Sequence, residues 1–234
     1  MNPKPIMNIK FLILLIGLLA LTGWSQSLIT SSFTNNTITT IPEGSQVGLV
    51  EQFNLSGVDG SVSNVQVTLD ITGGFNGDLY AYLVDPQGQL VVLLNRPGVT
   101  ALNPFGYADA GMNITLDGLA VNNIHDYASG GSGSYSLSGT TWAADGRDVN
   151  PLAAGGILYG TSTSANLSLF QNTDPNGVWT FFIADLGAGG GSASLNSYVL
   201  SVMTVPEPQV LPLVGGGLVL FAFLRIHRSR SIRR

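Results

Sequence analysis

The chain has 234 residues, no cysteine and a formal net charge of −5. The lack of cysteine excludes disulfides, thiol catalysis and cysteine-ligated zinc sites. Residues 26–204 hold thirteen acidic residues against two basic ones, a net charge of −11, so nucleic acid is not expected as a partner because its phosphates would be repelled. Thirty glycines and few helix formers in a span of this length predict one all-β domain.

Residues 1–25 have the pattern of a secretory signal peptide. Lys4 and Lys10 supply the positive charge, and Phe11 to Leu21 is an apolar run of 11 residues. Small residues precede a cleavage point expected after Ser25. The run is shorter than the roughly 20 residues that span a membrane, and no twin arginine precedes it, so export through Sec is predicted. A retained anchor is the alternative.

The domain is expected to begin with two strands. Leu28 to Thr40 alternates isoleucine and phenylalanine with serine, threonine and asparagine, which predicts an edge strand or a loose lead-in. A turn at Pro42 to Gly44 separates it from a strand over Val47 to Leu55.

The strongest pattern lies between Val62 and Leu94. Apolar residues alternate with polar ones as far as Ile71, which predicts a half-buried strand. Glycines then break the pattern, and two apolar strands follow, joined by a turn at Asp85–Gly88. Pro86 presets φ for this turn and Gly88 tolerates a positive φ. We expect these three strands to form one antiparallel sheet.

The second half of the domain is harder to interpret. Its predicted elements are a loop over 95–111, a short strand over 114–119, a flexible glycine- and serine-rich segment over 129–139, a short strand over 166–170 and a final strand pair over 178–185 and 194–203. Residues 140–160 receive no prediction. The strand over 178–185 is apolar on both faces, which predicts a central position in its sheet.

The last thirty residues have three parts in a fixed order. Pro206, Glu207 and Pro208 are followed by an apolar stretch from Val210 to Leu224. A basic end then carries Arg225, Arg228, Arg230, Arg233 and Arg234. The set resembles the PEP-CTERM sorting signal of Gram-negative bacteria, which implies recognition by an exosortase-type enzyme and temporary membrane attachment through residues 205–234. A permanent single-pass anchor is the alternative, with the arginines held inside.

Two blocks of the domain resemble the P (Homo B) domain that follows subtilisin-like proprotein convertases. The first is Gly77-Asp78-Leu79 with Val84 to Gly88, and the second is Asn176 to Asp185. The resemblance covers roughly Val47 to Met203 and fits poorly over 130–163. It implies a single antiparallel β-sandwich of jelly-roll-like, P-domain type over residues 26–204.

The resemblance also implies calcium. Asp78, Asp117 and Asp185 match acidic positions of the family, and hard cations take six to eight oxygen ligands such as these carboxylates provide. Gly118 replaces a second acidic residue of the pattern, which weakens one site. Turn capping by carboxylate-to-backbone hydrogen bonds is the alternative interpretation of Asp78 and Asp85.

Little in the sequence indicates catalysis. His125 is the one histidine between the two signals, and no nucleophile motif accompanies it, so a histidine on a surface loop is expected. Paired carboxylates for glycoside hydrolysis stay open among Asp70, Asp78, Asp85 and Asp117.

The sequence therefore predicts an exported, non-catalytic binding, adhesion or structural module. We expect it at the cell envelope, cell surface or extracellular matrix of a Gram-negative bacterium, calcium-stabilised through the three aspartates. Its expected partners are the sorting enzyme, the membrane before processing, and extracellular polysaccharide or another protein. The alternative is a carboxylate-dependent hydrolase acting on matrix polysaccharide.

Overall fold

A computed structural model describes residues 28–129, 137–163 and 165–206. The signal peptide predicted over 1–25 and the tail beyond Pro206 lie outside these residues. The strands are β1 (Ile29–Asn35), β2 (Thr39–Thr40), β3 (Leu49–Leu55), β4 (Ser61–Thr72), β5 (Leu79–Val84), β6 (Leu90–Asn95), β7 (Met112–Asp117), β8 (Ser138–Trp142), β9 (Gly177–Asp185) and β10 (Ser194–Val205). The helices are η1 (Asn76–Asp78), η2 (Ile124–Asp126), α2 (Gly155–Gly160) and η3 (Leu167–Phe170).

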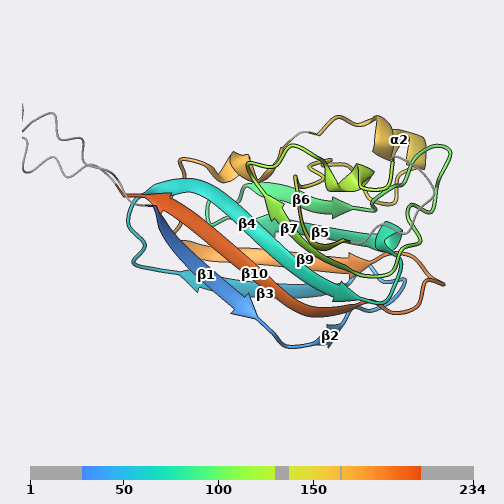
Figure 1. The fold of residues 1–234 in the computed structure, drawn as a ribbon, viewed down its shortest axis with the longest axis horizontal. Coiled ribbons are helices and arrows are strands. Elements are labelled where there is room, and N and C mark those ends of the chain that lie inside the picture. The colour runs from blue at the N-terminus through green and yellow to red at the C-terminus, as the bar shows by residue number, and fades with distance from the viewer. Residues whose placement is uncertain (1–27, 130–136, 164, 207–234) are drawn as a thin grey trace, which may run out of the picture.

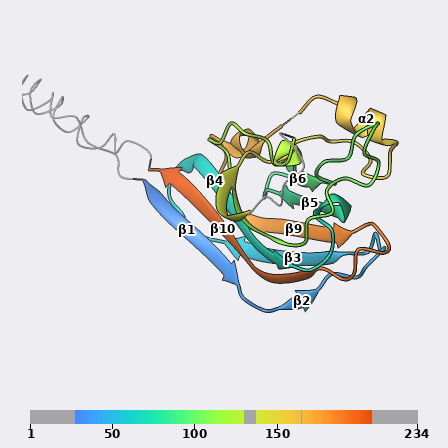
Figure 2. The ribbon, with the colours of Figure 1, turned by 45° about the vertical axis from the view of Figure 1, so that its right-hand side comes forward.

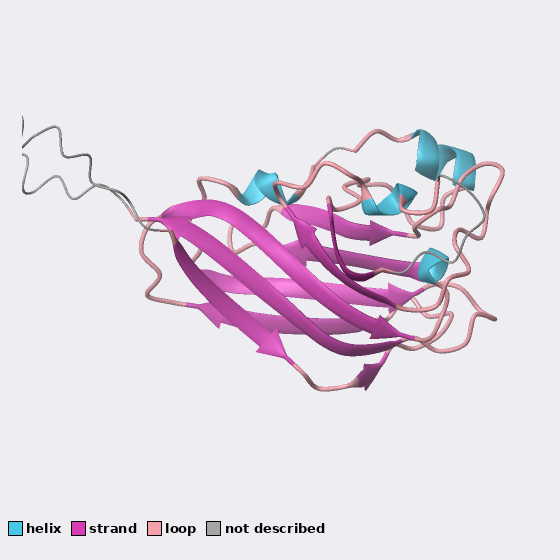
Figure 3. Cartoon of the chain, in the orientation of Figure 1, coloured by secondary structure: helices cyan, strands magenta, loops and turns pink. Residues whose placement is uncertain are grey.

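The strands form two sheets that face each other, which confirms the predicted all-β sandwich (Figures 1 and 3). Sheet A has the order β1-β10-β4-β7-β8, with β2 also on β10, and sheet B has the order β3-β9-β5-β6. The chain crosses between the sheets from β2 to β3, β3 to β4, β4 to β5, β6 to β7, β8 to β9 and β9 to β10, as in a jelly roll. The β7–β8 pair is parallel, so the sandwich is not antiparallel throughout.

The hydrophobic core lies between the two sheets, and the apolar residues that alternate along β4 face it as predicted. Val65, Val67, Leu69 and Ile71 of β4 are buried, each at most 2% exposed. They face a side of sheet B that includes Trp179 and Phe181. The ring of Phe181 stacks on Tyr198 of β10, with centroids 4.7 Å apart. Because each fully buried side chain of this size stabilises the fold by about 1.5 to 3 kcal/mol, this interior holds the two sheets together.

The predicted three-stranded sheet over Val62–Leu94 is wrong in one respect. All three strands form, but β4 belongs to sheet A while β5 and β6 pair in sheet B. The chain leaves β4 through Gly73 and Gly74, whose φ angles are +70° and +62°. These left-handed conformations turn the chain across the sandwich. A period of two identifies a strand and its buried face, but it does not identify the sheet.

Several local predictions have clear outcomes. The Asp85 turn forms as expected, because the Asp85 carboxylate accepts from the backbone N–H of Gln87 and of Gln89 at 3.0 and 2.7 Å. β9 is central in sheet B, between β3 and β5. The strand predicted over 166–170 is instead the helix η3, because the Asn166 side chain accepts from the Ser168 N–H and caps a helical turn.

The sandwich has two distinct ends. β1 begins beside the end of β10, with Ile29 opposite Thr204, so both ends of the described chain lie side by side. Figures 1 and 2 show this end at the left, and they show α2, η1 and the loops that flank them gathered toward the opposite end. We call these the chain-end pole and the loop pole. None of the helices in the described ranges is long and apolar enough to cross a membrane.

Candidate functional site at the loop pole

Pairing between β5 and β9 brings two of the predicted site residues together. Leu79 opposes Asp185, so Asp78, one residue earlier, enters the loop pole beside the end of β9. The Leu186 N–H donates to the Asp78 carbonyl at 2.8 Å and fixes this junction. Asp78 and Asp185 are 7% and 1% exposed, so both carboxylates are buried next to each other.

Asp185 is the more unusual of the two. Its Oδ2 atom is buried and has no hydrogen-bond partner among the described residues. Burial raises the pKa of Asp185 to about 6, and the neighbouring charges of Asp78 and Glu43 add to the rise, against hydrogen bonds from the Ala193 and Gly187 N–H groups. A buried carboxylate oxygen without a donor is costly, so this atom is a position where a proton or a cation would be favourable.

Asp78 has one positive neighbour. Burial raises its pKa first, the Arg96 guanidinium lowers it, and Glu43 raises it again. The Arg96 Nη2 atom lies 3.8 Å from the Asp78 Oδ1 atom, while its Nε donates to the Gly77 carbonyl at 3.2 Å. A Cβ on Gly187 would lie only 2.1 Å from the Asp78 carboxyl carbon, so a larger residue here would force the Asp78 carboxylate to move.

A glycine-rich loop covers this acidic pair. Glu43 accepts from the N–H groups of Gly189 and Gly191 at 2.9 and 3.2 Å, which ties residues 187–191 to the turn after β2. The Ser45 N–H donates to the Asp185 carbonyl at 2.9 Å. Asp78, Asp185 and Glu43 therefore bring three acidic groups to one end of the sandwich, with Arg96 beside them.

Asp117 does not join this group. It ends β7, whereas the carbonyl of Gly111, the residue before β7, accepts a hydrogen bond from the side chain of Asn76 in η1. Six residues of strand place Asp117 roughly 20 Å further along. Its two oxygens accept from the Asn64 and Gln66 amides, each at 2.8 Å. Despite partial burial, these bonds and the Leu119 N–H hold the pKa of Asp117 below its usual range.

Of the three aspartates predicted as calcium ligands, Asp78 and Asp185 therefore lie together, and Asp117 lies apart from them. Among the described residues, no group of three or more histidine, cysteine, aspartate or glutamate side chains is arranged to hold a metal. The Asp78–Asp117 pair also fails as a glycosidase pair, because Asp78 lies in η1 beside the start of β7 and Asp117 lies at the other end of that strand. Asp78 and Asp185 are the two candidates that the fold brings together.

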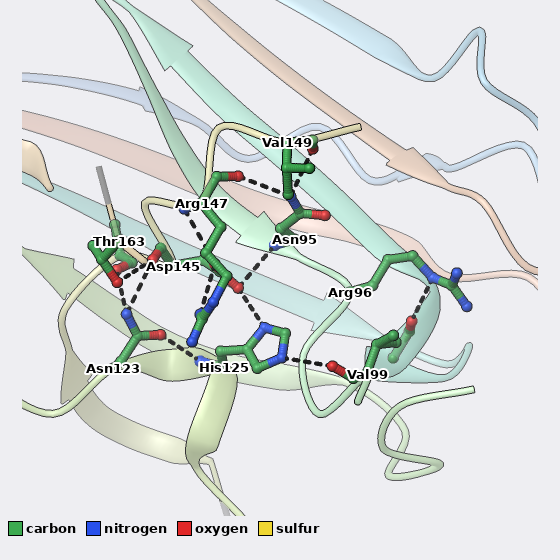
Figure 4. Close-up of polar contacts among 11 residues, drawn as sticks. Asn95, Arg96, Val99, Asn123, His125, Asp145, Arg147, Val149 and Thr163 are labelled. Atoms are coloured by element: carbon green, nitrogen blue, oxygen red, sulfur yellow. Dashed lines mark hydrogen bonds and ion pairs between the residues drawn. The ribbon is translucent and has the colours of Figure 1, made fainter. Parts of the chain in front are cut away.

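A second polar cluster lies beside this site and corrects the prediction for His125. The histidine is fully buried rather than on the surface. Its Nδ1 lies 2.6 Å from the Asp145 Oδ2, and its Nε2 lies 3.1 Å from the Val99 carbonyl oxygen (Figure 4). Both neighbours are acceptors, so the two bonds form together only when each ring nitrogen carries a proton.

Asp145 links this histidine to Arg147 and β6. Its Oδ1 accepts from the Arg147 Nη1 at 3.0 Å, and the Asn95 N–H donates to its Oδ2 at 3.3 Å (Figure 4). The Asn95 amide donates in turn to the carbonyls of Arg147 and Val149. The cluster attaches the segment after β8, which has no prediction from the sequence, to the edge of sheet B.

Among the described residues, no nucleophile is hydrogen-bonded to this histidine. Both of its ring nitrogens are taken by Asp145 and Val99, and the cluster is closed from solvent. Its chemistry is that of a structural ion network. The sequence contains one indication of this network. The domain has two arginines and one histidine, and charged side chains are rarely buried without a partner.

The outer face of sheet B carries a group of half-buried rings. Tyr82 stacks on Phe182 with centroids 4.8 Å apart, and Tyr80 meets Phe182 edge-on at 6.2 Å. Exposed Val178 lies on β9 with Phe182, and exposed Val50 lies on the neighbouring strand β3. Aromatic rings on an open sheet face are suited to stacking against apolar faces of a ligand.

Comparisons with known proteins assign no family. No family model matches the chain, and no curated protein matches it. Among solved structures, the chain is similar to a serine protease of Aeromonas sobria in complex with its chaperone, at 14% identity and a TM-score of 0.45, over 82% of this chain and 29% of that one. The serine protease of Aeromonas sobria alone gives 14% identity and a TM-score of 0.43, over 80% and 29%. The chain thus spans less than a third of either one.

Proposed function

We propose that the chain is an exported, non-catalytic β-sandwich module of P/Homo B type that binds polysaccharide or protein at the bacterial envelope or in the extracellular matrix. The observation that carries the proposal is the separation of the two poles. Both ends of the described chain lie at the chain-end pole, and α2 lies at the loop pole (Figure 2). The acidic pair and its glycine-rich loop lie at the loop pole as well, where β9 ends beside η1. A tail that attaches one end to a surface would leave the loop pole free.

The proposal includes a calcium ion bound by the carboxylates of Asp78 and Asp185. The donor set suits a hard cation, because the buried Asp185 Oδ2 has no donor among the described residues and lies in a negative environment. These two side chains would hold the ion, and the remaining ligands would be backbone carbonyls and water. Bound calcium would supply the charge compensation that Arg96 gives in part, and it would order the loop over 187–191.

Calorimetric titration of calcium into the purified chain tests this part. We expect binding that is lost in Asp185→Asn and kept in Asp117→Asn, a matched change at the opposite end of β7. Equal binding by both variants would place the ion elsewhere, and no binding by the unchanged chain would contradict the calcium proposal.

Export and sorting rest on the sequence of the two ends. We propose that Sec exports the chain and that an exosortase-type enzyme then processes the tail at Pro206, Glu207 and Pro208. The intact mass of the chain recovered from the producing bacterium tests this. We expect loss of residues 1–25 and of the basic end, and retention of that end when Glu207→Ala is introduced. A mature chain that keeps its arginines would identify a permanent anchor.

A carboxylate-dependent hydrolase is the second candidate. The observation that favours it is the pKa of about 6 for Asp185, next to the carboxylate of Asp78, since general acids need a raised pKa. The burial of Asp185, at 1% exposed, opposes it, because a general acid has to reach the glycosidic oxygen. The binding module therefore accounts for the site better.

A further inference from the structure

β1 is an edge strand of sheet A. One side of β1 pairs with β10, and no described strand pairs with its other side. Its seven residues pair with β10 from Ile29–Thr204 to Asn35–Tyr198 and with no other described strand. The ring of Phe33 stacks on that of Phe53 of β3, with centroids 4.7 Å apart, and so packs β1 against sheet B. The other side of β1 therefore presents a row of backbone N–H and C=O groups that another strand could pair with.

The remaining sheet edges are protected. Glu51 lies on the same face of β3 as the buried Phe53, and an inward-pointing charge of this kind blocks strand addition. The free edge of β6 is already hydrogen-bonded. The N–H groups of Asp145 and Gly146 donate to the carbonyls of Leu93 and Val92 at 3.1 and 2.9 Å. β8 is only five residues long. By contrast, residues 28–41 contain no charge and no proline.

We propose that β1 pairs antiparallel with β1 of a second copy of this chain, with the two-fold axis at Ser32. The outward-facing residues of β1 are arranged symmetrically about Ser32. Thr30 would oppose Thr34 and Ser32 would oppose Ser32 of the second copy, all on the outward face, and hydroxyl pairs of this kind stabilise neighbouring strands. The two six-stranded sheets would become one continuous sheet.

A row of polar side chains across sheet A ends at the same residue. On its outward face the Gln66 amide donates to Asp117 at 2.8 Å, Gln66 lies opposite Ser201, and the Ser201 hydroxyl lies 3.1 Å from that of Ser32. The row stops at the open edge. A Ser32–Ser32 contact would continue it into the second copy without a break.

Charge favours this edge over other contacts between copies. The described residues carry thirteen carboxylates against Arg96 and Arg147, so two copies repel over most of their surfaces. β1 is an uncharged strip on that surface. Antiparallel pairing also turns the second copy end for end, which places its loop pole beside the chain-end pole of the first. Pairing of this kind suits copies that are not attached side by side to one membrane.

Sedimentation velocity of residues 26–206, which contain both sheets and the whole described core, tests the pairing. We expect a monomer–dimer equilibrium that Ser32→Lys weakens about fivefold or more, because two like charges would then lie opposite each other. The control is Gln52→Lys, the same charge change on an outward position of β3. A monomer at all concentrations, or equal weakening by both variants, would overturn the proposal.

Cysteine cross-linking tests the register, because the chain has no cysteine of its own. Ser32→Cys would place two thiols opposite each other and should give a disulfide-linked dimer on mild oxidation. Thr30→Cys would leave its two thiols about 13 Å apart, beyond the reach of a disulfide. Faster cross-linking of Ser32→Cys supports the two-fold axis at Ser32, and equal rates for the two variants would overturn it.

Discussion

Replacing Asp185 by asparagine should stabilise the protein in the absence of calcium. The folded protein raises the pKa of Asp185 from 3.8 to about 6, so the unfolded chain releases its proton at lower pH than the folded chain does. Between about pH 4 and pH 6 the folded state therefore holds more protons, and stability falls as the pH rises through this range. The loss is complete at about pH 7, one unit above the folded-state pKa.

The size of the effect follows from the shift. A change of about two pKa units corresponds to about 3 kcal/mol at neutral pH, an upper limit for one group. Asparagine keeps the shape of the protonated acid and removes the charge. In EDTA at pH 7.5, we expect Asp185→Asn to raise the free energy of unfolding by up to this amount, or the melting temperature by up to about 10 °C for a domain of this length.

Urea unfolding from pH 4 to pH 8 in EDTA is the assay. The unchanged protein should lose stability from pH 4 to pH 6, and Asp185→Asn should lose much less. Asp109→Asn, at another acidic residue of the loop pole, is a control for the change in net charge. A destabilised Asp185→Asn at pH 7.5 would refute the reasoning, since it would mean that the charged carboxylate stabilises the fold.

Three further changes test neighbouring parts of the account. Asp117→Asn should destabilise the protein at neutral pH but not at pH 2, since the lowered pKa of Asp117 means that its contribution disappears as the pH falls; equal loss at both pH values would contradict this. Gly187→Ala should cost about 1 to 3 kcal/mol through its clash with Asp78, while Gly160→Ala, with open space around it, should cost less than 1, and similar melting temperatures would contradict the close approach. Asp145→Asn should cost about 3 to 5 kcal/mol by leaving His125 and Arg147 buried without their anion, whereas exposed Asp148→Asn should change little in the same melts.

The sequence was informative about strands because one property, alternation, is local. β4 was predicted from the period of Val65, Val67, Leu69 and Ile71, and the turn at Asp85 from the chemistry of its residues. The sheet to which each strand belongs depends on contacts between distant residues. The crossing at Gly73 and Gly74, which sends β5 to the other sheet, therefore could not be predicted from the pattern.

The candidate site was predicted in part for the same reason. Asp78 and Asp185 both stood next to strand ends, but only the register of β5 with β9 brings them together and keeps Asp117 away. The network of His125, Asp145 and Arg147 is built from residues up to 22 positions apart in a segment without a strand pattern. These residues come into contact only in the folded chain, so the sequence alone does not show that they pair.

Co-sedimentation with extracellular polymer from the producing organism tests the proposed function most directly. Residues 26–206 would be mixed with the polymer in calcium and then in EDTA, with Asp185→Asn beside them, and the length of the polymer would be measured afterwards. We predict retention in calcium, release in EDTA, weak retention of Asp185→Asn in either condition, and polymer of unchanged length. Shortened polymer would contradict a non-catalytic module, and retention that neither EDTA nor Asp185→Asn alters would contradict the role of the acidic pair.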